Sequence, residues 1–320
     1  MKRNNQQDKA IINEFLRNLR KNAAFLVMLS PGLILLIINC YIPMAGIVMA
    51  FQKINFKKFA FCGEWVGLNN IKAFIKSTYF PVITRNTLLY NLAFIILGTI
   101  LALFFAISLS ELWSKGARKT YQTIMFLPYF MSWVVISGIT VAFLNKTYGQ
   151  ANMLLSAMGK SPINWYAEKR YWPFIIISLN LWKGAGYGSV MYLSGINNID
   201  SILFEAAAID GASKWQQIKY ITLPLLKPLV IILTLLNIGN IFNTDIGLFY
   251  TVPQLGVNGS LIKVVSTVDT YIYTNLISGN SVSTVNFASA AALLQSIIGF
   301  VLIMVTNFIV RKIDNNYALF

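Results

Sequence analysis

Residues 205–211 read Glu-Ala-Ala-Ala-Ile-Asp-Gly, and residues 221–224, after a gap of nine, read Ile-Thr-Leu-Pro. They belong to a polar stretch, residues 195–225, that separates two apolar segments long enough to cross a bilayer. From residue 201 to residue 209 the good helix formers Leu203, Glu205 and three alanines predict two helical turns, with Asp200 or Ser201 as the N-cap. Gly211 then permits a sharp change of direction because it has no Cβ. A short helix ending in a glycine elbow is therefore expected outside the membrane.

The segment after the elbow, residues 213–221, predicts a second short helix. Trp215, Ile218 and Ile221 recur at helical spacing and give this helix one apolar edge. Pro224 is expected to stop it before the next apolar segment begins. The two helices and the elbow form a compact knuckle, and a loop this short is suited to contact with another protein.

The spacing EAA-x3-G-x9-I-x-L-P resembles the signature loop of permease subunits from ATP-binding-cassette (ABC) importers. Flanking segments are similar as well, and the similarity runs from about residue 25 to the C-terminus: YIPMAGIVMAFQKIN (41–55), WVGLNNIKAFI (65–75), RNTLLYNL (85–92), LPYFMSWVVISGI (127–139) and LWKGAGYGSVMYL (181–193). These segments look like sugar and polysaccharide importer permeases, in the branch of lipoprotein-type and complex-glycan permeases.

The resemblance implies an all-α membrane protein with six transmembrane helices and the type I, MetI-like permease fold. It also implies that the knuckle sits in a groove of a cytoplasmic ATPase. The residues that would carry this coupling are Glu205, Ala206, Ala207, Asp210, Gly211, Ile221, Leu223 and Pro224.

The same resemblance implies an assembly with a second homologous permease, two cytoplasmic ATPase subunits and an extracytoplasmic solute-binding protein. ATP and Mg²⁺ would then be bound by the partner ATPase, and this chain would be a non-catalytic subunit without a cofactor of its own. The expected substrate is an oligosaccharide or a complex glycan. A peptide or another solute is the alternative within the importer class, and a gradient-driven secondary transporter is the alternative outside it.

Composition independently indicates an integral membrane protein, because 56% of the residues are hydrophobic and only 12% are charged. Histidine is absent and only Cys40 and Cys62 carry thiols, which argues against histidine catalysis, zinc clusters, any other metal site and a disulfide framework. The Gly-x4-Gly-Lys-Ser/Thr nucleotide loop is also missing. The net charge of +15 is spread along the chain, so we assign it to membrane flanks facing lipid and not to nucleic acid.

Six apolar segments of about twenty residues are expected to span the membrane within a permease domain of residues 23–320. They are residues 23–50, 86–109, 121–144, 171–194, 225–250 and 287–310. Residues 1–22 predict a basic amphipathic segment on the inner membrane surface, or alternatively a frayed tail. A weakly amphipathic patch at residues 153–155 predicts a short helix on the outer surface.

Lysines and arginines are nearly balanced between the two sides of this arrangement. The two short flanks that are strongly basic for their size, the N-terminus and residues 111–120, decide the orientation. Both termini are therefore expected in the cytoplasm of a bacterial cell, with a multi-pass chain in its plasma membrane.

Polar side chains in the fifth segment suggest a substrate path. Asn237, Asn240 and Asn243 recur at three-residue intervals, so their carboxamides would lie along one helical stripe. Such groups are costly in hydrocarbon and usually face an interior or an aqueous cavity. They either line a path for sugar hydroxyls or bind neighbouring helices together. Aromatic and amide side chains elsewhere could add stacking faces, unless they are membrane-interface residues: Trp133, Asn180, Trp182 and Tyr187.

Lys183 is an ionisable side chain inside the fourth segment. It could pair with Asp245, bind an acidic sugar or reach the membrane surface, and we expect the pairing. Three glycines follow at alternate positions, which predicts close helix packing: Gly184, Gly186 and Gly188.

Overall fold

The computed structural model describes residues 17, 21–53, 63–112, 114–277 and 282–313. Helices dominate these residues, and one antiparallel pair of two-residue strands, β1 (Gln52–Lys53) and β2 (Glu64–Trp65), closes the connection after the first span. The amphipathic segment predicted for residues 1–22 lies almost wholly outside the described residues, as does Cys62. The all-α fold class is confirmed.

The helical elements follow the predicted segments with shifted boundaries. The first span is a continuous helical rod, and most of the others are joined by short connections. In chain order the elements are α2 (Ala23–Leu36), η1 (Ile37–Tyr41), α3 (Ile42–Met44), η2 (Ala45–Phe51), α4 (Asn69–Ile75), α5 (Tyr79–Ser110), α6 (Lys115–Phe130), α7 (Trp133–Leu144), α8 (Gln150–Ala157), η3 (Lys169–Tyr171), α9 (Trp172–Asn197), α10 (Ser201–Ile209), α11 (Lys214–Gln217), η4 (Ile218–Thr222), α12 (Leu223–Gly239), η5 (Gly247–Thr251), η6 (Gly259–Leu261), α13 (Ile262–Val265), α14 (Val268–Ile277) and α15 (Val282–Ile313).

Four helices among the described residues are long and apolar enough to cross a membrane, or five if the bent pair α6 and α7 counts as one span. The predicted count of six is not confirmed by this measure. The missing segment is α9, which is 26 residues long but carries Asn180, Lys183 and several glycines in its middle. These residues lower its mean hydropathy, and they are also the ones that face the interior of the bundle or its neighbours.

The third predicted span, residues 121–144, is not one helix. It consists of α6 and α7, which meet at an angle of 94°. Met131 and Ser132 are extended at the junction, and the Ser132 hydroxyl caps α7 by accepting the Val135 amide at 3.3 Å. Because the break leaves the last carbonyls of α6 without helical partners, another element must satisfy them.

The fifth predicted span, residues 225–250, is also broken. Helix α12 ends at Gly239, and a turn separates it from the one-turn π-helix η5. At its start, α12 continues without interruption from α11 through a π-helical turn, η4. The prediction that Pro224 stops the second knuckle helix is therefore wrong, because the wider π turn accommodates a residue that cannot donate a backbone hydrogen bond.

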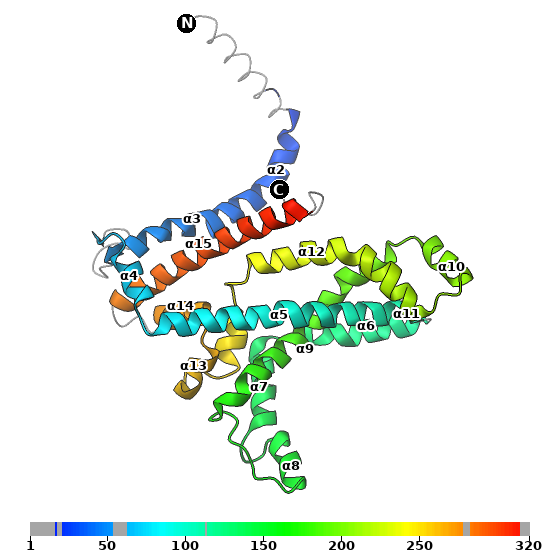
Figure 1. Ribbon diagram of the computed structural model, residues 1–320. Helices are drawn as coiled ribbons and strands as arrows, with labels where there is room; N and C mark the ends of the chain where they lie inside the picture. Colours follow the sequence, from blue (N-terminus) through cyan, green and yellow to red (C-terminus); the bar gives the residue numbers. More distant parts are fainter. Residues whose placement is uncertain (1–16, 18–20, 54–62, 113, 278–281, 314–320) are drawn as a thin grey trace, which may run out of the picture.

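Two layers of long helices form the body of the molecule (Figure 1). The rod of α2 and α3 runs beside α15, while α5, α6 and α9 lie together, with α12 between the layers. A Cβ at Gly186 would collide with the backbone carbonyl of Met125 on α6, so the predicted close packing of this glycine is confirmed. Gly188 packs against Ala102 of α5, whereas nothing lies within 4 Å of a Cβ built at Gly184.

Two structures project from this body. The knuckle of α10 and α11 lies at one end of the long helices, and α7 leads sideways to α8 (Figure 1). The helix predicted around residues 153–155 is thus confirmed as α8. The buried Asn152 fixes it by donating to three backbone carbonyls and accepting from Ile163 and Trp165.

Candidate functional site

The first half of the knuckle is built from local capping interactions. The Asp200 carboxylate caps α10 by accepting the Ile202 amide at 3.0 Å. At the other end, the Gly211 amide donates to Ala208 at 3.1 Å and the Ala212 amide donates to Ala207 at 2.8 Å. These two bonds form a Schellman motif, which requires a left-handed residue at Gly211. Its φ is +78°, so the predicted glycine elbow is confirmed.

The second half begins with a capping box. The Ser213 hydroxyl accepts the Gln216 amide at 3.4 Å, and the Gln216 side chain accepts the Ser213 amide at 2.7 Å. From there α11, η4 and α12 form one continuous helical segment as far as Gly239. The second half of the knuckle is consequently the end of a long helix.

The outer surface of the knuckle is apolar to a degree unusual for a polar loop. Ile209 is 87% exposed and Trp215 is 69% exposed, and Ile202 and Leu203 are exposed as well. Of the residues expected to carry coupling, the exposed ones are Glu205, Ala206, Asp210, Gly211, Leu223 and Pro224, and the half-buried ones are Ala207 and Ile221. Exposed apolar side chains gathered on one projection mark a surface for a protein partner.

An ion pair fastens the knuckle to the bundle. Lys214 at the start of α11 lies 3.2 Å from the carboxylate of Glu111, which follows α5. Arg118 strengthens the same corner by donating to the carbonyl of Ser110 at 2.7 Å. Movement of the knuckle would therefore displace both α12 and the end of α5.

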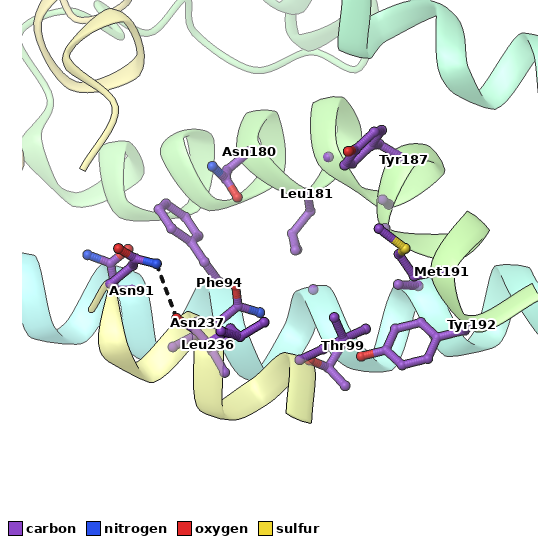
Figure 2. Close-up of a pocket in the computed structure, with 18 of the residues that line it drawn as sticks. Asn91, Phe94, Thr99, Asn180, Leu181, Tyr187, Met191, Tyr192, Leu236 and Asn237 are labelled. Carbon is purple, nitrogen blue, oxygen red and sulfur yellow. Dashed lines mark hydrogen bonds between the residues drawn. The ribbon is translucent and has the colours of Figure 1, made fainter. Parts of the chain in front are cut away.

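A cavity of about 490 Å³ lies in the middle of the bundle between α5, α9 and α12 (Figure 2). Carboxamides, tyrosines and apolar side chains line it. The five asparagines in its wall are Asn91, Asn180, Asn237, Asn240 and Asn243. The predicted single stripe is wrong, because α12 ends before Asn240 and Asn243 lies in the following turn. The three residues nevertheless reach the same cavity.

Three of these asparagines hold the broken fifth span together. Asn91 of α5 donates to the carbonyl of Ile241 at 2.8 Å and to that of Asn243 at 3.3 Å. The Asn243 amide donates to the side chain of Asn240 at 3.3 Å, and Gln295 of α15 donates to the Asn243 side chain at 2.8 Å. Carbonyls freed by the break thus find partners on other helices.

The remaining two asparagines are available to a ligand. Asn180 of α9 and Asn237 of α12 make no hydrogen bond with their side chains to any described residue. They come from different helices that face the cavity, as Figure 2 shows. Some carboxamides of this cluster thus bind neighbouring segments together, and two have no side-chain partner among the described residues.

Of the three aromatic candidates, one lines the cavity and two lie outside its lining. Tyr187 lines the cavity and stacks on Tyr129 with ring centroids 4.3 Å apart and planes 6° apart. Trp133 lies outside the cavity lining, where its indole donates to Asp245 and its ring packs against Gly247. Trp182 is exposed and also lies outside the lining.

The predicted pairing of Lys183 with Asp245 is wrong. The Lys183 ammonium donates to the carbonyls of Tyr129 and Met131, both at 2.7 Å, and to that of Pro128 at 3.5 Å. The break between α6 and α7 leaves the carbonyls of Tyr129 and Met131 without helical partners, whereas that of Pro128 also accepts the Met131 amide at 3.2 Å. A cation at a helix C-terminus is also favoured by the helix dipole. Lys183 is therefore the cap of the elbow in the third span.

Sequence reasoning missed three residues of this region. Asn91, Asp269 and Gln295 were not singled out, although each is a polar side chain in or beside an apolar segment. The Asp269 carboxylate accepts from the Thr244 hydroxyl at 2.9 Å and from Gln295 at 2.9 Å. A polar residue in a predicted span was the signal that could have found Asn91 and Gln295. Asp269 lies between the fifth and sixth predicted spans, where this signal does not apply.

An apolar helical bundle with a projecting knuckle at one end and a cavity lined by polar side chains between its helices has the architecture of a membrane permease. Residues 95–318 match the model of the family described as binding-protein-dependent transport system inner membrane component. The chain belongs to this family, which confirms the resemblance drawn from residues 205–224 and places the protein in a cell membrane.

Similar proteins cover nearly the whole chain. The polygalacturonan/rhamnogalacturonan transport system permease protein YteP of Bacillus subtilis is 30% identical over 89% of this chain and 87% of its own length. A crystal structure of a bacterial ABC transporter for import of the acidic polysaccharide alginate has a TM-score of 0.84 and 28% identity, covering 94% of this chain and 99% of the other. A second structure, of a bacterial alginate transporter with an alginate pentasaccharide-bound periplasmic protein, has a TM-score of 0.82 and 29% identity, covering 93% and 97%. The ABC permease fold is thereby confirmed.

Proposed function

We propose that this chain is one membrane subunit of an ATP-driven importer for oligosaccharides or complex glycans. The observation that carries the proposal is the central cavity, whose wall holds the free carboxamides Asn180 and Asn237 and the aromatic ring of Tyr187. Amides can donate to and accept from hydroxyls, and a flat ring can stack on a pyranose. The names of the similar permease and the similar structures, which refer to polysaccharides, support the same substrate class.

The working complex would contain a second homologous permease, two cytoplasmic ATPase subunits and an extracytoplasmic binding protein. The family description requires a binding protein, and one similar structure holds a periplasmic protein. ATP and Mg²⁺ would be bound by the ATPase subunits, and this chain would contribute no catalytic group or cofactor. Its lipid-facing surface is the band of exposed apolar side chains on the long helices, such as Phe104 and Phe300.

The knuckle would dock in a groove of the ATPase and transmit its closure. Ile209 and Trp215 offer exposed apolar contacts, and the exposed Glu205 offers a charge for orientation. From Lys214 to Asn237 the chain is helical, which corresponds to about 35 Å of rigid rod. Displacing one end of a rod moves the other, so closure of the ATPase would reshape the cavity.

The orientation follows from the position of the knuckle. If α10 and α11 dock on a cytoplasmic ATPase, the basic loop that contains Lys115 lies on the same side, and an even number of spans brings both termini there. The opposite end, with α4, η6 and α13, would then face the binding protein (Figure 1).

Uptake into proteoliposomes tests this function. The purified complex, with its binding protein outside and ATP inside, should import a labelled glycan, and the Glu205→Lys variant should lose ATPase co-purification and uptake together. Glu64→Lys, a charge reversal at an exposed residue of β2, is the matched control. Uptake that persists without ATP and collapses when an ion gradient is dissipated would instead support a secondary transporter. Uptake of peptides alone would reject the substrate class.

A further inference from the structure

The wall of the central cavity contains no carboxylate, ammonium or guanidinium group among the side chains that the structure places there. Besides the five asparagines it offers the hydroxyl groups of Thr99, Tyr187 and Tyr192 and a set of apolar side chains. This is a notable composition because charged residues do occur in the neighbouring segments, on α9, in the turn after α12 and on α14. Each of them is engaged elsewhere.

Lys183 is the cation beside the cavity, since Gly184 and Tyr187 of the same helix line it. Its ammonium points to the elbow of the third span, where carbonyl oxygens accept its hydrogen bonds. It also stands 5.5 Å from the ring centroid of Tyr129, the ring that lies behind Tyr187. Lys183 itself is not among the residues that line the cavity.

The two carboxylates near the cavity, Asp245 and Asp269, are likewise hydrogen-bonded to other protein groups. Asp245 accepts from the Trp133 indole and, at 2.8 Å, from the Gly247 amide. Asp269 accepts from Gln295, whose amide also donates to Asn243. Asn243 reaches the cavity while the carboxylate that organises it does not. Lys183, Asp245 and Asp269 are thus all absent from the cavity lining, although Asp245 is exposed.

We infer that the glycan transported through this cavity is uncharged. Moving a uronate out of water is costly when no cation accompanies it, whereas a neutral sugar needs only groups that exchange hydrogen bonds with hydroxyls. This chain supplies the second kind of wall. The inference rests on the proposed function and sets this protein apart from the similar alginate transporter, whose substrate is acidic.

The direct test compares neutral and acidic pentasaccharides. Proteoliposomes with the complete complex are supplied with end-labelled xylo-, arabino- and malto-pentaoses and with pentamers of galacturonate and alginate. Import of a neutral pentasaccharide, with no uptake of the acidic ones, is expected. Uptake of an acidic pentamer at a rate equal to or above the neutral ones would overturn the inference.

Two variants that introduce opposite charges at Asn237 test the selectivity of the cavity separately from that of the binding protein. Asn237→Asp is compared with the isosteric wild type, and Asn237→Lys is compared with Asn237→Met, using a pentasaccharide that the wild type imports. With a neutral glycan both charges should lower uptake by similar factors, within about threefold of each other, because a neutral ligand favours neither sign. An anionic glycan would favour Lys over Asp by at least about tenfold, even after screening, and would overturn the inference.

The same variants distinguish failure of the proposed function from failure of the inference that the substrate is uncharged. If all of them transport at the wild-type rate, Asn237 does not line the path, and the proposed function of the cavity is overturned together with the inference. Repeating the pair at Asn180, the other free carboxamide, guards against a variant that misfolds, and retention of the ATPase on purification verifies assembly. Unequal effects of Asp and Lys, with assembly intact, would reject only the neutrality of the substrate.

Discussion

Substituting Gly211 isolates the contribution of the knuckle's shape. The φ of +78° is left-handed, and no atom lies within 4 Å of a Cβ built there, so a substitution introduces backbone strain without a clash. An L-residue with a Cβ costs about 1–2 kcal/mol in this region, and a β-branched one lies at the upper end. Gly211→Val should therefore weaken docking of the ATPase by about 5- to 30-fold, since 1.4 kcal/mol corresponds to a factor of ten.

Two matched variants make this prediction specific. Gly211→Asn should lie near the wild type, because asparagine tolerates the left-handed region, and Gly211→Ala should lie between the two. The assay is the affinity of the permease for the ATPase subunits, together with ATP hydrolysis stimulated by the liganded binding protein. The reasoning is refuted if Val and Asn weaken docking equally, or if Val docks like the wild type while its φ remains positive.

Three further predictions concern the contacts around the cavity and the knuckle. Lys183→Met should lower the stability of the complex by about 2 kcal/mol, because it leaves carbonyls at the break between α6 and α7 without a donor. Lys183→Arg should recover part of that loss in a thermal unfolding assay, and equal stability of both variants would contradict the capping role. Asn240→Leu should cost about 1 kcal/mol of stability, because it removes the hydrogen bond with Asn243. Asn237→Leu should instead reduce uptake at unchanged stability. The opposite pattern in paired melting and uptake measurements would reverse the structural role assigned to Asn240 and the substrate-contacting role assigned to Asn237. The ion pair between Glu111 and Lys214 is largely exposed, so reversing the charge of either residue alone should lower coupled transport at most about fivefold. Reversing both charges should restore transport, and no recovery in the double variant would show that the pair does not act as a unit.

How far sequence alone reaches is clearest at the knuckle. Asp200, the alanine-rich turn and Gly211 interact with residues at most five positions away, as the capping and Schellman bonds show. Interactions of that range are set by local backbone chemistry, which the amino-acid order specifies directly. The helix, the elbow and the positive φ could therefore be predicted without any knowledge of the bundle.

The apolar segments were predictable for a related reason. Each must satisfy its own backbone within the membrane, so hydropathy and length suffice to assign helices. Their interruptions were not predictable in this way. The elbow after Pro128 and the turn after Gly239 occur inside segments whose apolar composition continues on both sides.

Only the tertiary structure decided what happens at these interruptions. A break frees backbone carbonyls, and whether it is tolerated depends on donors from helices distant in the chain. Lys183 reaches carbonyls more than fifty residues away, and Asn91 reaches the carbonyl of Ile241, which is 150 residues away. The sequence therefore determined that polar groups occur in the apolar segments. The packing of distant helices determined that two of them, Asn180 and Asn237, keep side chains without a hydrogen-bond partner among the described residues.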